Sequence, residues 1–460
     1  MHRRELLSAA ASAAGLALAS PLRAAPPAPR MQAWLERWMR AFNAEDLAIY
    51  AAFVRAHAPS VTPYLDDDLS VREVTGGFEL LSVETAADTE ITALVRDRAW
   101  DRRSRLTLRA TDDVQLEDIV FAAAPAGEPQ TRLQEREAVD RAAGRLDQQG
   151  RAGRFSGSVL VARDTAILLR AAHGVADEAT GVANTPATRF CIGSMGKMFT
   201  AVAVMQAVER GQLSLDAPLR AYLPDYPNAA IADRVTVRHL LTHTGGTGDI
   251  FGPDFDGLEG GLSDAAGLIA LYGARDPVFE PGARWGYSNY GFILLGRLVE
   301  VATGRPYAAV VEDQILRPAG MTRTSLGFAH EGPTARSYTG ARATGLRALS
   351  PYVGLPAGGA YSTVDDLHAF AGALRAGRLV RPDTLAQMTA PHVAAGASHW
   401  GLGFAIRTRN GQRYYGHAGS APGVSGELAL FPTYTTAVLS NRGHPSALCA
   451  ADFVGARLPA

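Results

Sequence analysis

The most distinctive chemical group in the sequence is a single amine. The chain has 460 residues and 45 basic side chains, of which Lys197 is the one lysine and the other 44 are arginine. Arginine stays protonated in proteins, whereas burial can lower the pKa of a lysine until its amine accepts a proton. Ser194 lies three residues before Lys197, at the start of an apolar helix expected to end near Gly211. Because side chains three apart on a helix share a face, the sequence predicts a serine nucleophile with an amine that takes or relays its proton.

Two later segments offer partners for this pair. Tyr287 and Asn289 lie in a turn-rich loop before an apolar helix, where they provide a phenol for proton transfer and an amide for hydrogen bonding. His417 and Gly419, followed by Ser420, lie in a glycine-rich stretch that leads into strand-like residues. Glycine at a strand edge lets a substrate backbone approach closely, so we expect His417 to face the substrate as a donor or a cation.

Other chemistries fail on their motifs. A phosphate-binding loop needs Gly and Ser or Thr where the chain has Cys191 and Met198, and the sequence contains neither GxSxG nor HExxH. Cys191 and Cys449 are the two cysteines, which excludes a disulfide framework and a CxxC metal cluster. They are either two buried free thiols or one bridge. We therefore expect no cofactor and no metal.

Composition describes a globular chain without a polyanionic partner. Hydrophobic residues make up 47% and charged residues 20%, and the net charge is −1. This balance provides no electrostatic footprint for nucleic acid or anionic lipid, so the expected partner is a small-molecule or peptide-like substrate. Beyond the N-terminus no apolar run approaches 18 residues, which predicts no permanent membrane anchor. The oligomeric state stays open.

The first 25 residues have the anatomy of an export signal. A basic start is followed by an apolar stretch and a small-residue exit. The pair Arg3-Arg4 favours a twin-arginine signal, with a general secretory signal as the alternative. We expect a periplasmic or secreted protein.

Hydrophobic periodicity divides the rest into two domains. Residues 31–122 carry helical spacing over 31–55, broken near Asn43, and period-two alternation over 77–122, which predicts a small α+β domain. Its pattern is similar to that of nuclear-transport-factor-2-like domains. Residues 123–130 form the expected linker. The second domain, 131–460, begins with a helix over 131–149 and a hairpin turning at Asp164-Thr165.

Residues 131–455 resemble the serine β-lactamase and penicillin-binding-protein-like hydrolases, in the branch of class C β-lactamases, D-alanyl carboxypeptidases, D-aminopeptidases and esterases. The resemblance is carried by Ser-x-x-Lys (194–197), Tyr-x-Asn (287–289) and His-x-Gly (417–419) in the family's order, with further matches at 236–246, 318–321 and 358–363. It implies an α+β, β-lactamase/transpeptidase-like fold: an antiparallel sheet flanked by helices plus a helical subdomain, here preceded by a small α+β domain.

The resemblance also implies roles. Ser194 would be the nucleophile, Lys197 and Tyr287 would handle its proton, and Asn289 would orient the network and the substrate. Which of Lys197 and Tyr287 is the general base stays open. The oxyanion hole would be the backbone N–H groups of Ser194 and Ser420, the latter following His-x-Gly.

Two departures from the family pattern bear on the substrate. Gly196 stands where many relatives have a polar residue, which could alter the cleft wall. His417 stands where Lys of the Lys-Thr-Gly element is usual, and neutral imidazole predominates at pH 7. This weakens binding of a carboxylate and shifts the expectation away from antibiotic resistance.

The sequence therefore predicts an exported serine hydrolase that forms an acyl-enzyme and cleaves an ester, amide or peptide-like substrate. Within enzymes, the alternatives are a β-lactamase and a D-alanyl-D-alanine carboxypeptidase. The alternative from another class is a non-catalytic binding or assembly protein that retains the fold.

Overall fold

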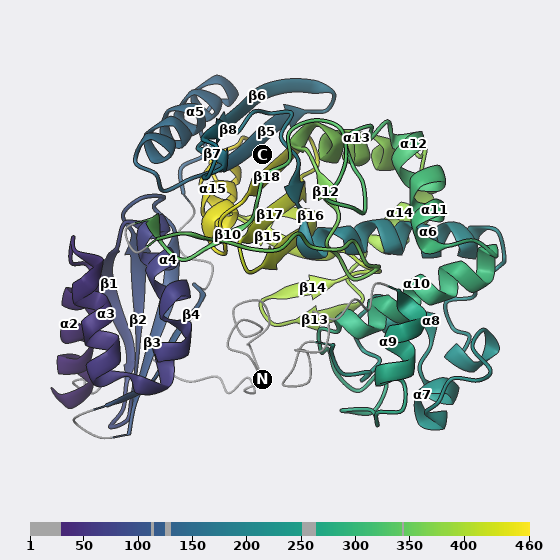
Figure 1. The fold of residues 1–460 in the computed structure, drawn as a ribbon, viewed down its shortest axis with the longest axis horizontal. Coiled ribbons are helices and arrows are strands. Elements are labelled where there is room, and N and C mark those ends of the chain that lie inside the picture. Colours follow the sequence, from purple (N-terminus) through teal and green to yellow (C-terminus); the bar gives the residue numbers. More distant parts are fainter. Residues whose placement is uncertain (1–28, 112–114, 125–129, 251–263, 343–344) are drawn as a thin grey trace.

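A computed structural model describes residues 29–111, 115–124, 130–250, 264–342 and 345–460 (Figure 1). The expected export signal, residues 1–25, and most of the expected linker lie outside the described residues. In the part of the chain that the structure describes, no helix is both long and apolar enough to cross a membrane.

The N-terminal unit, residues 29–124, packs helices against a four-stranded antiparallel sheet of order β1-β2-β3-β4 (Figure 1). The helices are α2 (Pro29–Phe42), α3 (Leu47–His57), η1 (Pro59–Tyr64) and α4 (Leu65–Thr75). The strands are β1 (Phe78–Ala86), β2 (Glu90–Asp97), β3 (Arg103–Ala110) and β4 (Leu116–Ala123).

Local sequence explains most of these elements. Buried positions alternate along β2 and β3, as expected for strands with one face on a core. In that core, the ring of Phe42 on α2 stacks on Trp38, a residue of the same helix, and on Phe78 of β1. The sequence pattern predicts neither η1 nor α4, because apolar spacing there is weak; α4 instead carries three aspartates in its first turn, where the helix dipole favours them. The nuclear-transport-factor-2-like likeness of this unit stays a prediction.

The second unit is built on an eight-stranded antiparallel sheet of order β13-β14-β15-β16-β17-β18-β5-β6. Its first hairpin therefore pairs with its last strand. The strands are β5 (Gly157–Arg163), β6 (Ala166–His173), β13 (Val393–Ala395), β14 (Ser398–Trp400), β15 (Ala405–Arg409), β16 (Gln412–Ala421), β17 (Val424–Leu430) and β18 (Tyr434–Ser440). The hairpin turn lies at Asp164-Thr165, as predicted.

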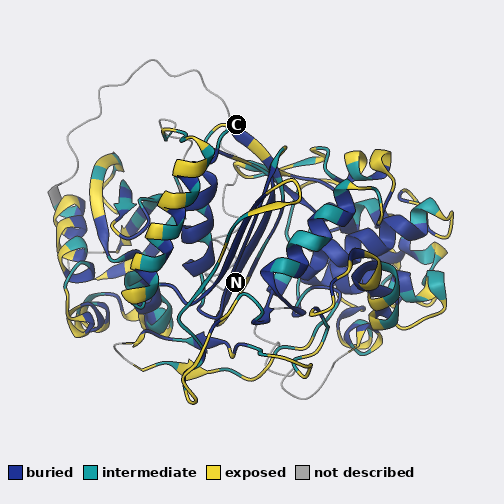
Figure 2. Cartoon of the chain, turned by 90° about the horizontal axis from the view of Figure 1, so that it is seen from above, coloured by how far each residue is buried: buried dark blue, intermediate teal, exposed yellow. Residues whose placement is uncertain are grey.

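Helices cover both faces of this sheet, so every residue of β17 and β18 is buried (Figure 2). On β5, Val159 and Val161 join a core with α5 (Glu135–Arg151) and α15 (Ser446–Gly455). The intervening Leu160 and Ala162 join the larger core with α6 (Lys197–Glu209) and α13 (Val364–Arg375). Successive side chains of β5 point to opposite faces of the sheet, so the strand contributes to two hydrophobic cores, one on each face.

The remaining elements form the helical subdomain and the edges of the cleft. The helices are η2 (Gly193–Gly196), η3 (Leu219–Ala221), α7 (Ala229–Arg234), α8 (Val237–Leu241), α9 (Ala265–Tyr272), α10 (Asn289–Thr303), α11 (Tyr307–Val311), η5 (Glu312–Leu316), α12 (Arg317–Ala319) and α14 (Pro382–Met388). The short strands are β7 (Val175–Asp177), β8 (Val182–Ala183), β9 (Phe190–Cys191), β10 (Tyr338–Thr339), β11 (Arg347–Ala348) and β12 (Tyr361–Ser362). The predicted α+β architecture, an antiparallel sheet flanked by helices plus a helical subdomain, is confirmed.

The two units meet at the turn between β2 and β3. Trp100, 1% exposed, packs edge-on against Phe155 and Phe453 with ring centroids 6.0 and 6.4 Å away. Beside it, Arg102 Nε donates to Asp452 Oδ2 at 2.6 Å. The N-terminal unit therefore docks on the sheet face covered by α5 and α15, opposite α6.

Candidate active site

Ser194 lies where η2 runs into α6, and η2 packs against β16 and β17 of the central sheet. Gly193 begins η2 with φ +50°, a left-handed conformation that glycine adopts without strain. Ser194 is half-buried, whereas α6 is buried on nearly all sides because it lies between the sheet and the helical subdomain. Its first residue, Lys197, is 0% exposed.

The amine of Lys197 contacts three oxygen atoms. Its Nζ lies 3.1 Å from Ser194 Oγ, 2.6 Å from Asn289 Oδ1 and 2.5 Å from the carbonyl oxygen of Ala357. Burial lowers the pKa of Lys197 to about 7, against the opposing negative charge of Asp249. A large fraction of this amine is therefore neutral near physiological pH.

The contacts orient the neutral amine. A neutral amine has two N–H bonds and one lone pair, and the Oδ1 of Asn289 and the carbonyl of Ala357 accept hydrogen bonds but cannot donate. When both N–H groups point at these oxygens, the lone pair faces Ser194 Oγ, which is the group with a proton to lose. The arrangement can deprotonate Ser194.

Asp249 holds Asn289 in this orientation. Its Oδ2 accepts from Asn289 Nδ2 at 3.1 Å, and its Oδ1 accepts from the backbone N–H of Asn289 at 3.2 Å. Because the carboxylate takes the amide nitrogen, the amide oxygen faces Lys197. Sequence reasoning missed Asp249 and the carbonyl of Ala357. The signal for Asp249 was its position just after the 236–246 motif, but no residue spacing indicates that it reaches Asn289.

Tyr287 lies beside the amine, as its spacing from Asn289 predicts. Lys197 Nζ is 4.9 Å from the centroid of the Tyr287 ring. The same ring packs against His243, with ring centroids 4.3 Å apart, and edge-on against Trp400, with ring centroids 5.8 Å apart. These aromatic contacts hold Tyr287 in place beside Lys197. Trp400 belongs to no recognised motif, so the sequence did not predict its role.

The imidazole of His417 is neutral, and its one N–H group is already hydrogen-bonded within the protein. Its Nδ1 donates to the carbonyl oxygen of Ala418 at 2.6 Å, so the neutral ring has an acceptor at Nε2. Burial first, and the charge of Lys197 second, lower the pKa of His417 to about 3. Nε2 is buried and has no hydrogen-bond partner among the described residues. The expectation that His417 serves as donor or cation is corrected: the geometry makes it an acceptor.

Glycines bring the expected oxyanion-hole amides together. A Cβ on Gly419 would lie 2.0 Å from the Ile192 carbonyl, and a Cβ on Gly193 would lie 3.3 Å from the Ser420 nitrogen. The strand end that carries Ser420 therefore lies directly against the segment that carries Ser194. That the N–H groups of Ser194 and Ser420 form the oxyanion hole stays a prediction of the resemblance.

The surroundings of Gly196 explain one departure from the family pattern, and His243 supports the same region. A Cβ on Gly196 would lie 3.2 Å from Gly358 Cα, so its lack of a side chain lets the loop with Ala357 approach the amine. His243 Nδ1 accepts from the backbone N–H of Ser288 at 3.1 Å and so fixes the residue before Asn289. Gly196 and His243 shape the site without touching Ser194.

The three sequence motifs thus converge on Ser194, and comparison with known proteins agrees. The Beta-lactamase family model matches residues 138–457, more than half of the chain. This chain belongs to the beta-lactamase family. It has the β-lactamase fold, and its relatives carry the names penicillin-binding protein, esterase and D-aminopeptidase.

Individual family members share part of their length with it. The putative penicillin-binding protein PbpX of Bacillus subtilis (strain 168) is 28% identical over 277 residues, covering 59% of this chain and 66% of that protein. Esterase EstB of Burkholderia gladioli is 38% identical over 192 residues, covering 38% of this chain and 48% of that protein. The crystal structure of a penicillin binding protein from Bacillus halodurans superposes with a TM-score of 0.61 at 30% identity, covering 68% of this chain and 97% of that one. The chain spans about half to two thirds of these two curated relatives.

The cysteines take no part in this family site. Cys191 and Cys449 are both free and buried. Burial raises the pKa of the Cys191 thiol to about 12, which makes it a packing group rather than a nucleophile. Among the described residues no group of three or more His, Cys, Asp or Glu could hold a metal ion.

Proposed function

We propose that this family member is an exported hydrolase that forms an acyl-enzyme at Ser194, with Lys197 as the general base. The observation that carries the proposal is the buried amine whose two N–H bonds have acceptors in Asn289 and Ala357 and whose third contact is Ser194 Oγ.

In the acylation step, Ser194 Oγ forms a bond to the substrate carbonyl carbon while its proton passes to Lys197 Nζ. The oxygen of the tetrahedral intermediate receives hydrogen bonds from the N–H groups of Ser194 and Ser420, each worth about 3 kcal/mol of transition-state stabilisation. The bond to the leaving group then breaks, and the leaving group takes the proton from the Lys197 ammonium, directly or through the Tyr287 hydroxyl.

Deacylation repeats these roles with water. The neutral amine accepts a proton from water as the water oxygen attacks the acyl carbon. The bond to Ser194 Oγ breaks, and the proton returns to Oγ. The free acid leaves, and the enzyme is restored.

The neutral acceptor at His417 supports a substrate without a carboxylate at that side of the cleft. A carboxylate needs a donor or a cation, and His417 Nε2 is neither. We therefore propose esters or uncharged amides ahead of β-lactams and peptides with a free C-terminus. The relative named as an esterase is consistent with this order.

Labelling with a fluorophosphonate probe tests the proposal. Wild type should label, and Ser194→Ala should not. Ser420→Ala is the matched control, because it keeps the backbone N–H and should label normally. Loss of wild-type labelling, or labelling that survives Ser194→Ala, would reject the acyl-enzyme. A p-nitrophenyl ester, a D-amino-acid amide and nitrocefin then rank the substrates; faster turnover of nitrocefin than of the ester would reject the substrate order.

A further inference from the structure

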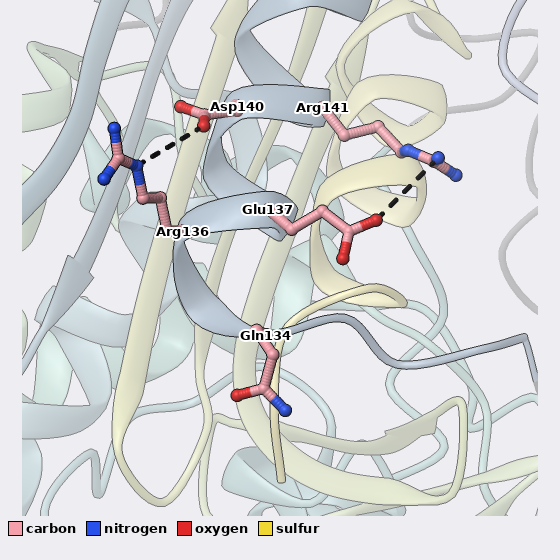
Figure 3. Close-up of a pocket in the computed structure, with 5 residues that line it drawn as sticks. All are labelled: Gln134, Arg136, Glu137, Asp140 and Arg141. Carbon is pink, nitrogen blue, oxygen red and sulfur yellow. Dashed lines mark ion pairs between the residues drawn. The ribbon is translucent and has the colours of Figure 1, made fainter.

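Two hollows lie along helix α5, and they differ in their charge balance. The first, in Figure 3, is open and is lined by Gln134, Arg136, Glu137, Asp140 and Arg141. Arg136 faces Asp140 at 3.9 Å, and Arg141 faces Glu137 at 4.0 Å. Its two cations and two carboxylates cancel, so this hollow is the ordinary solvated face of a helix.

The second hollow lies between the two units of the chain and has a volume of about 260 Å³. We name it the junction cavity. Its lining, as far as the structure describes the chain, contains no acidic residue. The N-terminal unit and the segment around the end of α5 both contribute to its wall, with Gly76, Arg98 and Ala99 from the former and Arg145, Gln149 and Arg154 from the latter.

The three arginines of the junction cavity make no ion pair within the described part of the chain. Arg154 Nη1 reaches Gln149 Oε1 at 3.4 Å. Arg145 Nη1 donates to the carbonyl oxygen of Ala99, and its guanidinium lies 4.6 Å from the ring centroid of Phe453. All of these partners are uncharged, so three positive charges face one cavity without a counterion among the described residues.

Acidic residues close by in sequence are bound elsewhere. Asp147 pairs with Arg151 at 2.8 Å. The Oδ1 of Asp97 accepts from the backbone N–H of Trp100 at 2.5 Å, and its Oδ2 accepts from that of Arg102 at 3.2 Å. Neither carboxylate lines the junction cavity.

Burial, and then the positive charge of the junction cavity, lowers the pKa of a neighbouring arginine, Arg72. Gly76 has φ +66°, and a Cβ there would lie 3.4 Å from Arg154 Nε, so this guanidinium lies directly against the backbone that ends α4. The pKa of Arg72, in the last turn of α4, is lowered by burial and then by the positive charges of Arg154 and Arg98.

We propose that the junction cavity binds a small oxyanion of the phosphate type between the N-terminal unit and the hydrolase unit. Guanidinium groups bind the oxygens of phosphate through paired N–H bonds. A cavity of about 260 Å³ is smaller than the roughly 300 Å³ at which pockets for drug-sized ligands begin, which limits the ligand to a phosphate group with a small substituent. A bound dianion joins residues from both units, so it stabilises their docked state.

Phosphate titration of the full chain at constant ionic strength tests this proposal, read by isothermal calorimetry and by the melting temperature. Wild type should bind inorganic phosphate and melt at a higher temperature as phosphate rises. Arg98→Gln combined with Arg154→Gln should weaken binding at least tenfold. Arg141→Gln is the matched control on the same helix and should bind like wild type. Glycerol phosphate distinguishes the sources: equal binding indicates a phosphate monoester, and loss of binding indicates the free ion.

Binding is read without hydrolysis, so the outcome is independent of Ser194. No heat and no melting shift in wild type would overturn the proposal. An equal shift with acetate or chloride, or phosphate binding unchanged by the paired substitution, would also overturn it. If circular dichroism shows that the double variant does not fold, Arg98→Gln alone decides, because the Arg98 side chain is exposed and its loss leaves the packing intact.

Discussion

Asp249 binds Asn289 through both of its carboxylate oxygens, one on the backbone N–H and one on the side-chain amide. These two hydrogen bonds fix the orientation of the Asn289 side chain, so that its amide oxygen faces Lys197. It also places a negative charge near the amine, where it raises the pKa of Lys197 against the effect of burial. Asp249 thus acts on the proposed base in two ways: it orients Asn289, which contacts the amine, and it raises the proton affinity of the amine.

Asp249→Asn should therefore change the pH profile as well as the rate. Without the negative charge, the pKa of Lys197 falls further, so the acid limb of kcat/KM moves to lower pH. The plateau kcat should drop by about 10- to 100-fold, because a hydrogen bond to a charged group contributes about 1.5–3 kcal/mol and each 1.4 kcal/mol or so is a factor of ten in rate. Asp264→Asn is the control, since Asp264 caps α9. A rate loss without a pH shift would reduce Asp249 to a purely structural residue.

Lys197→Arg should abolish the base while keeping the net charge. A guanidinium stays protonated and has no lone pair for the proton of Ser194. We expect ester turnover to fall by about 10² to 10⁴, the range for loss of a general base. Circular dichroism checks that the buried side chain is accommodated. Activity like that of wild type in Lys197→Arg would contradict the role of the amine.

The activity of wild type should rise with pH. Since burial lowers the pKa of Lys197 to about 7, the amine is protonated and inactive below that value and neutral above it. kcat/KM reports the free enzyme, so its logarithm should climb with unit slope below about pH 7 and level off above it. The rate of ester hydrolysis, measured from pH 5 to 9, tests for this rise in kcat/KM and for the plateau above it. A profile that is flat down to pH 5 would assign the proton transfer to another group.

The sequence predicts the site better than it predicts what tunes the site. The site residues that the sequence predicts belong to short motifs: Ser194 and Lys197 in one, Tyr287 and Asn289 in another. Each motif folds into one local segment, so residue type and spacing are enough to predict these residues. Asp249 acts across 40 positions on Asn289, and the Ala357 carbonyl acts across 160 positions on Lys197. Contacts over such separations depend on how the helical subdomain packs, which no local pattern encodes.

The protonation state of His417 shows the same limit. Its type and its glycine neighbours indicate a substrate-facing residue, and the sequence allows donor, cation or acceptor. The choice is made by its depth of burial, by the Ala418 carbonyl that takes Nδ1, and by the nearby charge of Lys197. The same reasoning applies to α4, whose helix depends on packing in the N-terminal unit rather than on apolar spacing.

Gly419→Ala should disable the oxyanion hole. The new Cβ would lie 2.0 Å from the Ile192 carbonyl, so the strand end must move away from the start of η2. The Ser420 N–H then leaves its position beside Ser194, and kcat should fall about 10² to 10³. Gly372→Ala on α13 is the matched control, because nothing lies within 4 Å of its Cβ. Equal activity of the two variants would place the oxyanion donors elsewhere.

Arg409→Met should destabilise the fold rather than the chemistry. Arg409 is 8% exposed and bridges Glu427 at 2.9 Å and Asp452 at 2.7 Å, and Glu427 is 1% exposed. Removing Arg409 leaves the buried Glu427 with a longer contact to Arg407 at 3.7 Å, and breaking a buried ion pair costs about 3–5 kcal/mol of unfolding free energy, measured here by urea denaturation.

Two further variants separate charge from packing at this position. Arg409→Met combined with Glu427→Leu removes both charges and should recover much of the loss, because a packed apolar pair carries no desolvation cost. Arg234→Met breaks the exposed pair with Glu280 and should change stability little, since solvent already screens that pair. If Arg409→Met unfolds no more easily than Arg234→Met, the buried network of Arg409, Glu427 and Asp452 does not hold α15 and β17 together.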